Sequence, residues 1–203
     1  MERSKIFTVG ITGASGVIYG VRLVQELLKL GHKVHLVVTE AGWQVFEQEL
    51  DWNAGNRQSI ILEQWQKFGG ELHYHTLQDF SAPIASGSYQ TDGMVVIPCS
   101  MGTLSGIAHG ASGNLLERAA DVVLKEGKKL IIVPRETPLN QIHLKNMLKL
   151  AQAGAKILPA MPGFYHKPKT MEELVNHLIG KVLDSLEVEH SLFKRWGENI
   201  VET

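Results

Sequence analysis

Short apolar runs alternate along most of this chain with stretches whose apolar residues recur at helical spacing. A continuous apolar run bounded by glycine, proline or threonine is typical of a strand buried on both faces of a parallel sheet. Strands are therefore predicted at residues 5–11, 33–38, 93–98, 129–134 and 156–158, with a weaker pattern at 71–75.

The intervening stretches predict amphipathic helices. In the first of them Val21, Val24, Leu27 and Leu28 share one face, and Gly31 ends the pattern. Helices are predicted at residues 17–30, 40–50, 57–68, 103–109, 115–125, 139–152 and 171–186, and a short tail element at 191–196. This alternation indicates an α/β fold: one doubly wound, Rossmann-like or flavodoxin-like domain over residues 1–203, with a mostly parallel sheet and a C-terminal helical tail at about 170–203.

The first predicted strand runs into a glycine-rich segment, GITGASG at residues 10–16. Glycines between a strand and a helix let backbone N–H groups approach a phosphate at the helix N-terminus. The spacing differs from that of the dinucleotide fingerprint, and the second strand ends in Thr39, although Glu40 follows. The segment therefore favours a phosphate-bearing ligand over a purely structural turn, and a mononucleotide over a nicotinamide dinucleotide.

Two further strand ends carry polar residues. Ser100 and Thr103 follow the strand at 93–98, where they offer donors to a ligand and also suit the cap of the next helix. Arg135 and Glu136 follow the strand at 129–134 and predict a phosphate clamp and a proton carrier, with a surface ion pair as the alternative. Since ligands of open parallel sheets bind beyond the carboxyl ends of the strands, the three segments predict one site.

Thr137-Pro138, directly after Glu136, is predicted to cap and begin the next helix. Cys99 is predicted as a small buried filler and not as a nucleophile. His73 and His75 share one strand face, which is predicted to face solvent. The tryptophans Trp43, Trp52 and Trp65 are predicted as core or subunit contacts.

Charge and composition exclude several classes of protein. Lys and Arg number 20 and Asp and Glu 21, for a formal charge of −1, which gives no basic footprint for nucleic acid or anionic lipid. No apolar run is long enough for a membrane span, and no secretion signal is recognised. One cysteine and unpatterned histidines predict no metal site, and a reducing, cytoplasmic location is expected. Neither a Gly-x-Ser-x-Gly elbow nor a Walker A lysine motif is present.

Taken together, several segments resemble the UbiX-type flavin prenyltransferases. They are GITGASGVIYGVRL, SGSYQTDGMVVIPCSMGTLSGIAHG, LLERAADVVLKE, VPRETPL and PGFYHKP, in this order over nearly the whole chain. The resemblance implies that the chain binds FMN and transfers a dimethylallyl group from dimethylallyl phosphate to N5 and C6 of reduced FMN. It also implies a UbiD-type decarboxylase as recipient of the prenylated FMN, and a homododecamer with sites at subunit junctions.

The same resemblance implies the site residues by position. The FMN contacts are Gly13, Ala14, Ser15, Thr39, Ser100, Met101, Gly102, Thr103 and Arg135. Tyr165 and Lys181 meet the prenyl phosphate, and catalysis involves Ser15, Glu49, Arg118, Lys125, Glu136 and Trp196. Two positions depart from the family pattern, since many relatives carry lysine at Gly102 and some carry arginine at Lys181. Glycine at position 102 removes a side-chain cation. Lysine at position 181 keeps the positive charge but cannot form the bidentate hydrogen bonds of an arginine.

These residue types suit the implied chemistry. Cationic side chains stabilise a leaving phosphate without a metal, and no aspartate-rich magnesium motif is present. Tyr165, Trp196 or the flavin can face a developing allylic cation, and Glu136 or the departing phosphate can accept the proton from C6. The alternatives are a flavin-dependent decarboxylase of a cysteine-derived substrate, whose Asn-containing motif is absent here, and a non-catalytic FMN carrier. Because Tyr165, Lys181 and Trp196 follow the last predicted strand, some of them are expected to act on a neighbouring subunit's flavin.

Overall fold

The buried apolar runs form one six-stranded sheet in the computed structural model, which describes residues 3–195. The strands are β1 (Ile6–Ile11), β2 (Lys33–Val38), β3 (Glu71–His75), β4 (Gly93–Cys99), β5 (Leu130–Pro134) and β6 (Lys156–Ile157). All pairs are parallel and their order is β3-β2-β1-β4-β5-β6. The expected α/β fold is confirmed, and this order is that of the Rossmann type, not of flavodoxin.

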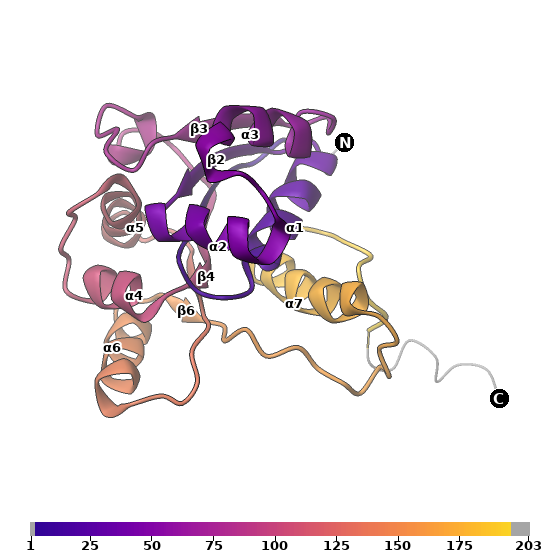
Figure 1. Cartoon of the computed structure of the whole chain (residues 1–203). Coiled ribbons are helices and arrows are strands. Elements are labelled where there is room, and N and C mark those ends of the chain that lie inside the picture. Colours follow the sequence, from indigo (N-terminus) through magenta and orange to yellow (C-terminus); the bar gives the residue numbers. More distant parts are fainter. Residues whose placement is uncertain (1–2, 196–203) are drawn as a thin grey trace.

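Helices cover both faces of the sheet (Figure 1). They are α1 (Val17–Lys29), α2 (Glu40–Leu50), α3 (Arg57–Trp65), α4 (Met101–Ala108), α5 (Leu115–Lys125), α6 (Gln141–Gln152) and α7 (Met171–Leu186), with short 3₁₀ turns η1 (Ala54–Asn56) and η2 (Pro83–Ala85). Every predicted helix is present, and the differences lie at the ends.

Two helices begin where a cap, not the apolar pattern, places the first turn. Thr137-Pro138 was predicted to begin the helix that is now α6, and this prediction is wrong. The side chain of Asn140 accepts a hydrogen bond from the backbone N–H of His143 at 2.9 Å, so α6 begins at Gln141. Similarly, Ser100 caps α4, which therefore begins at Met101 and not at residue 103.

The C-terminal part is only partly helical. Residues 158–170 connect β6 to α7 without a helix or strand and run along the outside of the molecule, orange to yellow in Figure 1. Beyond α7, residues 191–195 form neither a helix nor a strand, so the predicted tail element is absent there. Trp196 lies outside the described residues. The single-domain extent of 1–203 stays a prediction.

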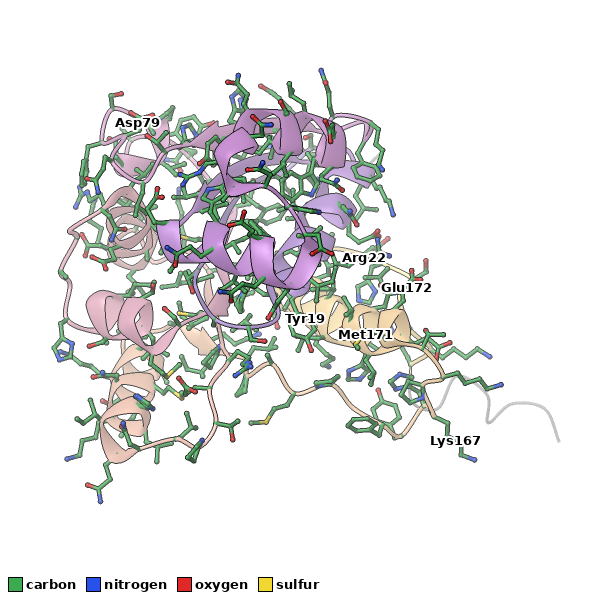
Figure 2. The ribbon with its side chains drawn as sticks, in the orientation of Figure 1. Tyr19, Arg22, Asp79, Lys167, Met171 and Glu172 are labelled. Atoms are coloured by element: carbon green, nitrogen blue, oxygen red, sulfur yellow. The ribbon has the colours of Figure 1, made fainter. Side chains whose placement is uncertain are left out.

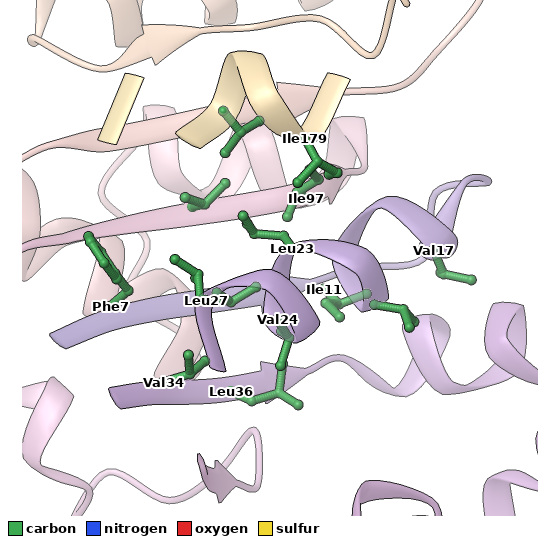
Figure 3. Packing of buried hydrophobic residues seen from close by; sticks show 14 of the residues in the cluster. Phe7, Ile11, Val17, Leu23, Val24, Leu27, Val34, Leu36, Ile97 and Ile179 are labelled. Carbon is green, nitrogen blue, oxygen red and sulfur yellow. The ribbon is translucent and has the colours of Figure 1, made fainter. Parts of the chain in front are cut away.

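The core has one apolar cluster on each face of the sheet. The larger cluster packs α1, α2, α3 and α7 against β1 and β2, and Figure 3 shows Leu23 beside Ile97 and Val24 beside Leu36. Each such side chain is fully or almost fully buried, which stabilises the fold by about 1.5–3 kcal/mol per residue. The smaller cluster packs α4 and α5 against β4 and β5.

The tryptophan prediction is confirmed. Trp43 and Trp65 are almost completely buried in the larger cluster, and Trp52 packs against it while partly buried. Within residues 3–195, no helix has the length and apolar character that a bilayer crossing requires.

Candidate active site

The carboxyl ends of the central strands are joined to one another by hydrogen bonds. Thr12, fully buried after β1, donates its hydroxyl to the carbonyl of Pro98 at 2.8 Å and accepts the N–H of Ser100 at 2.8 Å. The N–H of Arg135 bonds the carbonyl of Cys99 at 3.2 Å. These bonds bring the three segments predicted from the sequence to one edge of the sheet.

The glycine-rich loop places a carboxylate at the start of α1. A side chain on Gly13 would overlap Ala41 of α2, so only glycine allows this approach. Glu49, also on α2, accepts the N–H groups of Gly16 at 2.9 Å and Val17 at 3.1 Å. The anion at the N-terminus of α1 is thus the Glu49 carboxylate, although the sequence predicted a ligand phosphate at this position.

The start of α4 offers donors above the sheet edge. Ser100 accepts the N–H of Thr103 at 3.4 Å, and the two hydroxyls lie 3.2 Å apart, so the capping interpretation is confirmed. Met101 is partly buried, and nothing lies within 4 Å of a side chain built on Gly102. Thr39 caps α2 in the same way, accepting the N–H of Gly42 at 3.0 Å.

Beside these segments lies a cavity of about 380 Å³, a size typical of small-molecule sites. Its lining comes from the glycine loop, α1, the segment after β5 and the start of the 158–170 segment. The lining residues are Ser15, Gly16, Tyr19, Pro134, Arg135, Glu136, Thr137, Ala160 and Met161. The structure therefore brings together Ser15, Arg135 and Glu136, as expected, while Gly13, Ala14, Thr39 and Ser100–Thr103 lie at the neighbouring strand and helix ends without lining it.

Tyr19 is a cavity residue that the sequence analysis missed. It follows Gly16 by three residues, one helical turn, so helical spacing from the glycine loop could have identified it. Burial raises the pKa of its hydroxyl, and the nearby Arg135 guanidinium opposes this shift. In the same cavity lining, the Glu136 carboxylate accepts the N–H of Thr137 at 3.0 Å. Ala160 and Met161 also line the cavity, but no sequence motif around them indicates a binding site.

Two predicted cations lie on another surface. Arg118, on α5, donates to the carbonyl of Ala85 at 3.1 Å and pairs with Asp121 at 2.9 Å. Lys125, at the end of the same helix, pairs with Glu126. Within this chain neither side chain lines the cavity that holds Arg135.

The late residues also lie apart from that cavity. Tyr165 contacts His177 of α7, with 3.2 Å between Tyr165 Oη and His177 Nε2. Lys181 lies one turn further along α7, 3.9 Å from Asp184. Figure 2 places Lys167, two residues beyond Tyr165, at the far end of the 158–170 segment from Tyr19. One chain therefore does not assemble the complete predicted set.

Comparison with known proteins identifies the family. The family model described as "Flavoprotein" matches residues 1–191. Flavin prenyltransferase UbiX of Alkalihalophilus pseudofirmus is 69% identical, over 96% of this chain and 97% of that protein. The same-named protein of Halalkalibacterium halodurans is 66% identical, over 95% and 94%. The chain belongs to the UbiX family of flavin prenyltransferases.

Solved structures agree with this membership. The crystal structure of AnUbiX in complex with FMN and dimethylallyl pyrophosphate superposes with a TM-score of 0.87, at 37% identity over 96% of this chain and 98% of that one. A dodecameric FMN-dependent UbiX-like decarboxylase from Escherichia coli gives 0.85, at 43% identity over 94% and 98%. The peptidyl-cysteine decarboxylase EpiD, with 19% sequence identity and a TM-score of 0.60, shares the fold.

The residues of this UbiX family member suit a flavin mononucleotide. Arg135 and the hydroxyls of Ser15, Ser100 and Thr103 are groups that can donate hydrogen bonds to a phosphate, and nothing lies within 4 Å of a Cβ built on Gly102 in the first turn of α4. Among residues 3–195, no three His, Cys, Asp or Glu side chains are arranged to hold a metal ion. Cys99 is completely buried, which raises the pKa of its thiol and agrees with the filler prediction.

The prediction that His73 and His75 both face solvent is wrong for His75. Its side chain is 11% exposed, and its Nε2 lies 2.8 Å from Nδ1 of the buried His35. The hydroxyl of Tyr89 contacts the other nitrogen of His35 at 2.9 Å. The segment after β3 covers this strand face, which the local sequence pattern did not reveal.

Proposed function

We propose that the chain transfers a dimethylallyl group from dimethylallyl phosphate to reduced FMN, joining it at N5 and C6. The product, prenylated FMN, then serves a UbiD-type decarboxylase. The observation that carries the proposal is the identity of 69% and 66% to proteins named flavin prenyltransferase UbiX over nearly the whole chain. The cavity beside the strand ends, whose lining includes Arg135 and the hydroxyl groups of Ser15, Tyr19 and Thr137, supports it.

FMN is held in this proposal by the strand-end segments. The contacts are Gly13, Ala14, Ser15, Thr39, Ser100, Met101, Gly102, Thr103 and Arg135. The reduced flavin supplies the nucleophilic ring positions. The residues of the chain hold its phosphate and keep its reactive edge against the cavity where Glu136 lies.

The leaving phosphate must be stabilised as the allylic C–O bond breaks and its electron pair passes to oxygen. Arg135 lies at the cavity, whereas Arg118, Lys125, Tyr165 and Lys181 lie on other surfaces of the same chain. We infer that neighbouring copies bring these groups together. The dodecameric relative from Escherichia coli and the exposed apolar side chains around Tyr165 support a homododecamer.

Proton removal from C6 needs an acceptor near the cavity. Glu136 lies there with one backbone N–H bonded to its carboxylate, and it is the proton carrier in this proposal. Glu49 bonds backbone amides at the start of α1 and supports the loop beside the flavin. The single, buried cysteine and the need for a reduced flavin support a cytoplasmic location.

The direct test is incubation of the protein with FMN, a chemical reductant and dimethylallyl phosphate, followed by mass analysis of the extracted flavin. A flavin heavier by one five-carbon unit is expected, and Glu136→Gln should bind FMN normally while forming this product more slowly. An unchanged flavin mass would contradict prenyl transfer. The two alternative functions would then be tested in turn. Decarboxylation would be assayed with cysteine-derived substrates, and a carrier role would be assayed by the release of FMN to a partner enzyme.

A further inference from the structure

A buried histidine of α7 contacts Tyr165, a residue of the proposed substrate site. His177 is only 6% exposed. Its ring lies between α7 and the loop at residues 163–166, and Gly163 allows this approach because a side chain there would meet the ring at 3.0 Å. Both ring nitrogens have partners: Nδ1 lies 3.1 Å from the backbone nitrogen of Gly163, and Nε2 lies 3.2 Å from the Tyr165 hydroxyl oxygen.

These two bonds determine the tautomer of His177. A backbone N–H can only donate, so Nδ1 must be the acceptor in the contact with Gly163. A neutral imidazole then carries its proton on Nε2. Nε2–H therefore donates to the Tyr165 oxygen, and the hydroxyl's own proton must point in another direction.

The surroundings keep the ring neutral and fixed. His166 stacks on His177 with 5.0 Å between ring centroids, and Phe193 contacts it at 5.1 Å. Burial, His166 and Lys181 together lower the pKa of His177 from its ordinary value. The charged and titratable groups that face His177 are therefore His166, Tyr165 and Lys181. Of these, His166 and Lys181 both oppose the protonation of His177.

We propose that His177 is a positioning residue: by donating to the Tyr165 oxygen, it directs the Tyr165 hydroxyl proton toward an oxygen of the prenyl phosphate. A phenol whose oxygen already accepts one hydrogen bond is a better donor, since bonds in a chain polarise one another. The inference rests on the proposed function, because it gives Tyr165 a phosphate to bond.

The test compares two substitutions of similar length. The amide of His177→Gln can accept from Gly163 and donate to Tyr165, whereas His177→Met can do neither. Steady-state kinetics with dimethylallyl phosphate should show kcat/KM reduced about tenfold in His177→Met, a typical effect of losing one hydrogen bond to a charged group, and reduced less in His177→Gln. The dissociation constant for FMN should stay unchanged in both.

A Tyr165→Phe background separates positioning from a general packing effect. Without the Tyr165 hydroxyl, His177→Met should lower kcat/KM by less than twofold. An equal loss in both backgrounds, or no loss in either, would overturn the inference. If His177→Met does not fold, as judged by its thermal midpoint, His177→Phe takes its place in the same cycle. A wild-type protein that forms no prenylated flavin would instead overturn the proposed function, so the two failures are distinguishable.

Discussion

At the scale of single residues, Thr12 and Gly13 show how the site depends on two adjacent positions of different chemistry. The buried hydroxyl of Thr12 joins the ends of β1 and β4 through two hydrogen bonds. Gly13 has no side chain, and this lets the loop lie against Ala41 of α2. The position of the loop is therefore fixed by the hydrogen bonds of the Thr12 hydroxyl and by the close packing of Gly13 against Ala41.

Substitution of Gly13 tests the packing. In Gly13→Ala the new methyl group would overlap the side chain of Ala41 and lie 3.1 Å from its backbone carbonyl carbon, so the backbone must move. Such overpacking should lower the free energy of unfolding by about 1–3 kcal/mol. The measurement is the urea midpoint of the FMN-free protein.

Gly102→Ala is the matched control. It lies in the first turn of α4, where no atom lies within 4 Å of the new methyl group. Alanine favours a helix, so this variant should keep or raise the free energy of unfolding, by up to about 1 kcal/mol. Equal destabilisation of the two variants would show that the Ala41 contact is not the cause.

At the scale of elements, β2, β3 and the segment after β3 meet in a group of histidines. The His35 ring stacks between His73 at 5.2 Å and His75 at 5.1 Å, and Tyr89 closes the group from the covering segment. Asp79, labelled in Figure 2, lies 3.6 Å from His75. Imidazoles so close together resist protonation, because the charged form of one repels the next.

This group predicts an acid-sensitive stability. Burial, followed by His75, His73 and Lys33, lowers the pKa of His35 from 6.5 to about 4, with Glu71 opposing. The unfolded chain therefore takes up a proton near pH 6.5, and the folded chain only near pH 4. The His35 contribution to stability is complete above pH 6.5 and falls by about 1–2 kcal/mol between pH 7 and 5.

Urea unfolding at several pH values between 7.5 and 4.5, at one protein concentration, measures this effect. His35→Gln should show a shallower dependence on pH than the wild type, because the group that titrates on unfolding is gone. His109→Gln, at an exposed histidine that directly follows α4, is the surface control. If His35→Gln follows the wild-type curve, another group causes the pH dependence.

At the scale of the whole molecule, apolar side chains remain exposed on the outer helix and the late loop. Leu144 and Leu148, one turn apart on α6, are 52% and 58% exposed, and Phe164 is 69% exposed. Large apolar side chains exposed on a surface are typical of subunit contacts. The same late loop carries Tyr165 of the proposed substrate site, so assembly and activity should depend on each other.

Charge placed on this surface tests the assembly. Leu144→Glu combined with Leu148→Glu should reduce the assembly mass measured by light scattering below that of the unsubstituted protein, and prenyl transfer should fall with it. The control is Lys145→Glu combined with Lys149→Glu, which introduces two glutamates at exposed α6 positions next to Leu144 and Leu148. This variant should leave the assembly mass unchanged. If both double variants keep the mass of the unsubstituted protein, the α6 surface is not a subunit contact.

The sequence alone predicted the strands, helices and sheet class, because apolar periodicity records which residues are buried. It also placed Ser15, Arg135 and Glu136 at one site, because parallel strands end at one edge of the sheet. Tertiary structure decided what distant segments do to each other. Glu49 reaches α1 from α2, the segment after β3 buries His75, and α7 positions Tyr165 through His177. No local pattern encodes such contacts, because they join residues that only the folded chain brings within bonding distance.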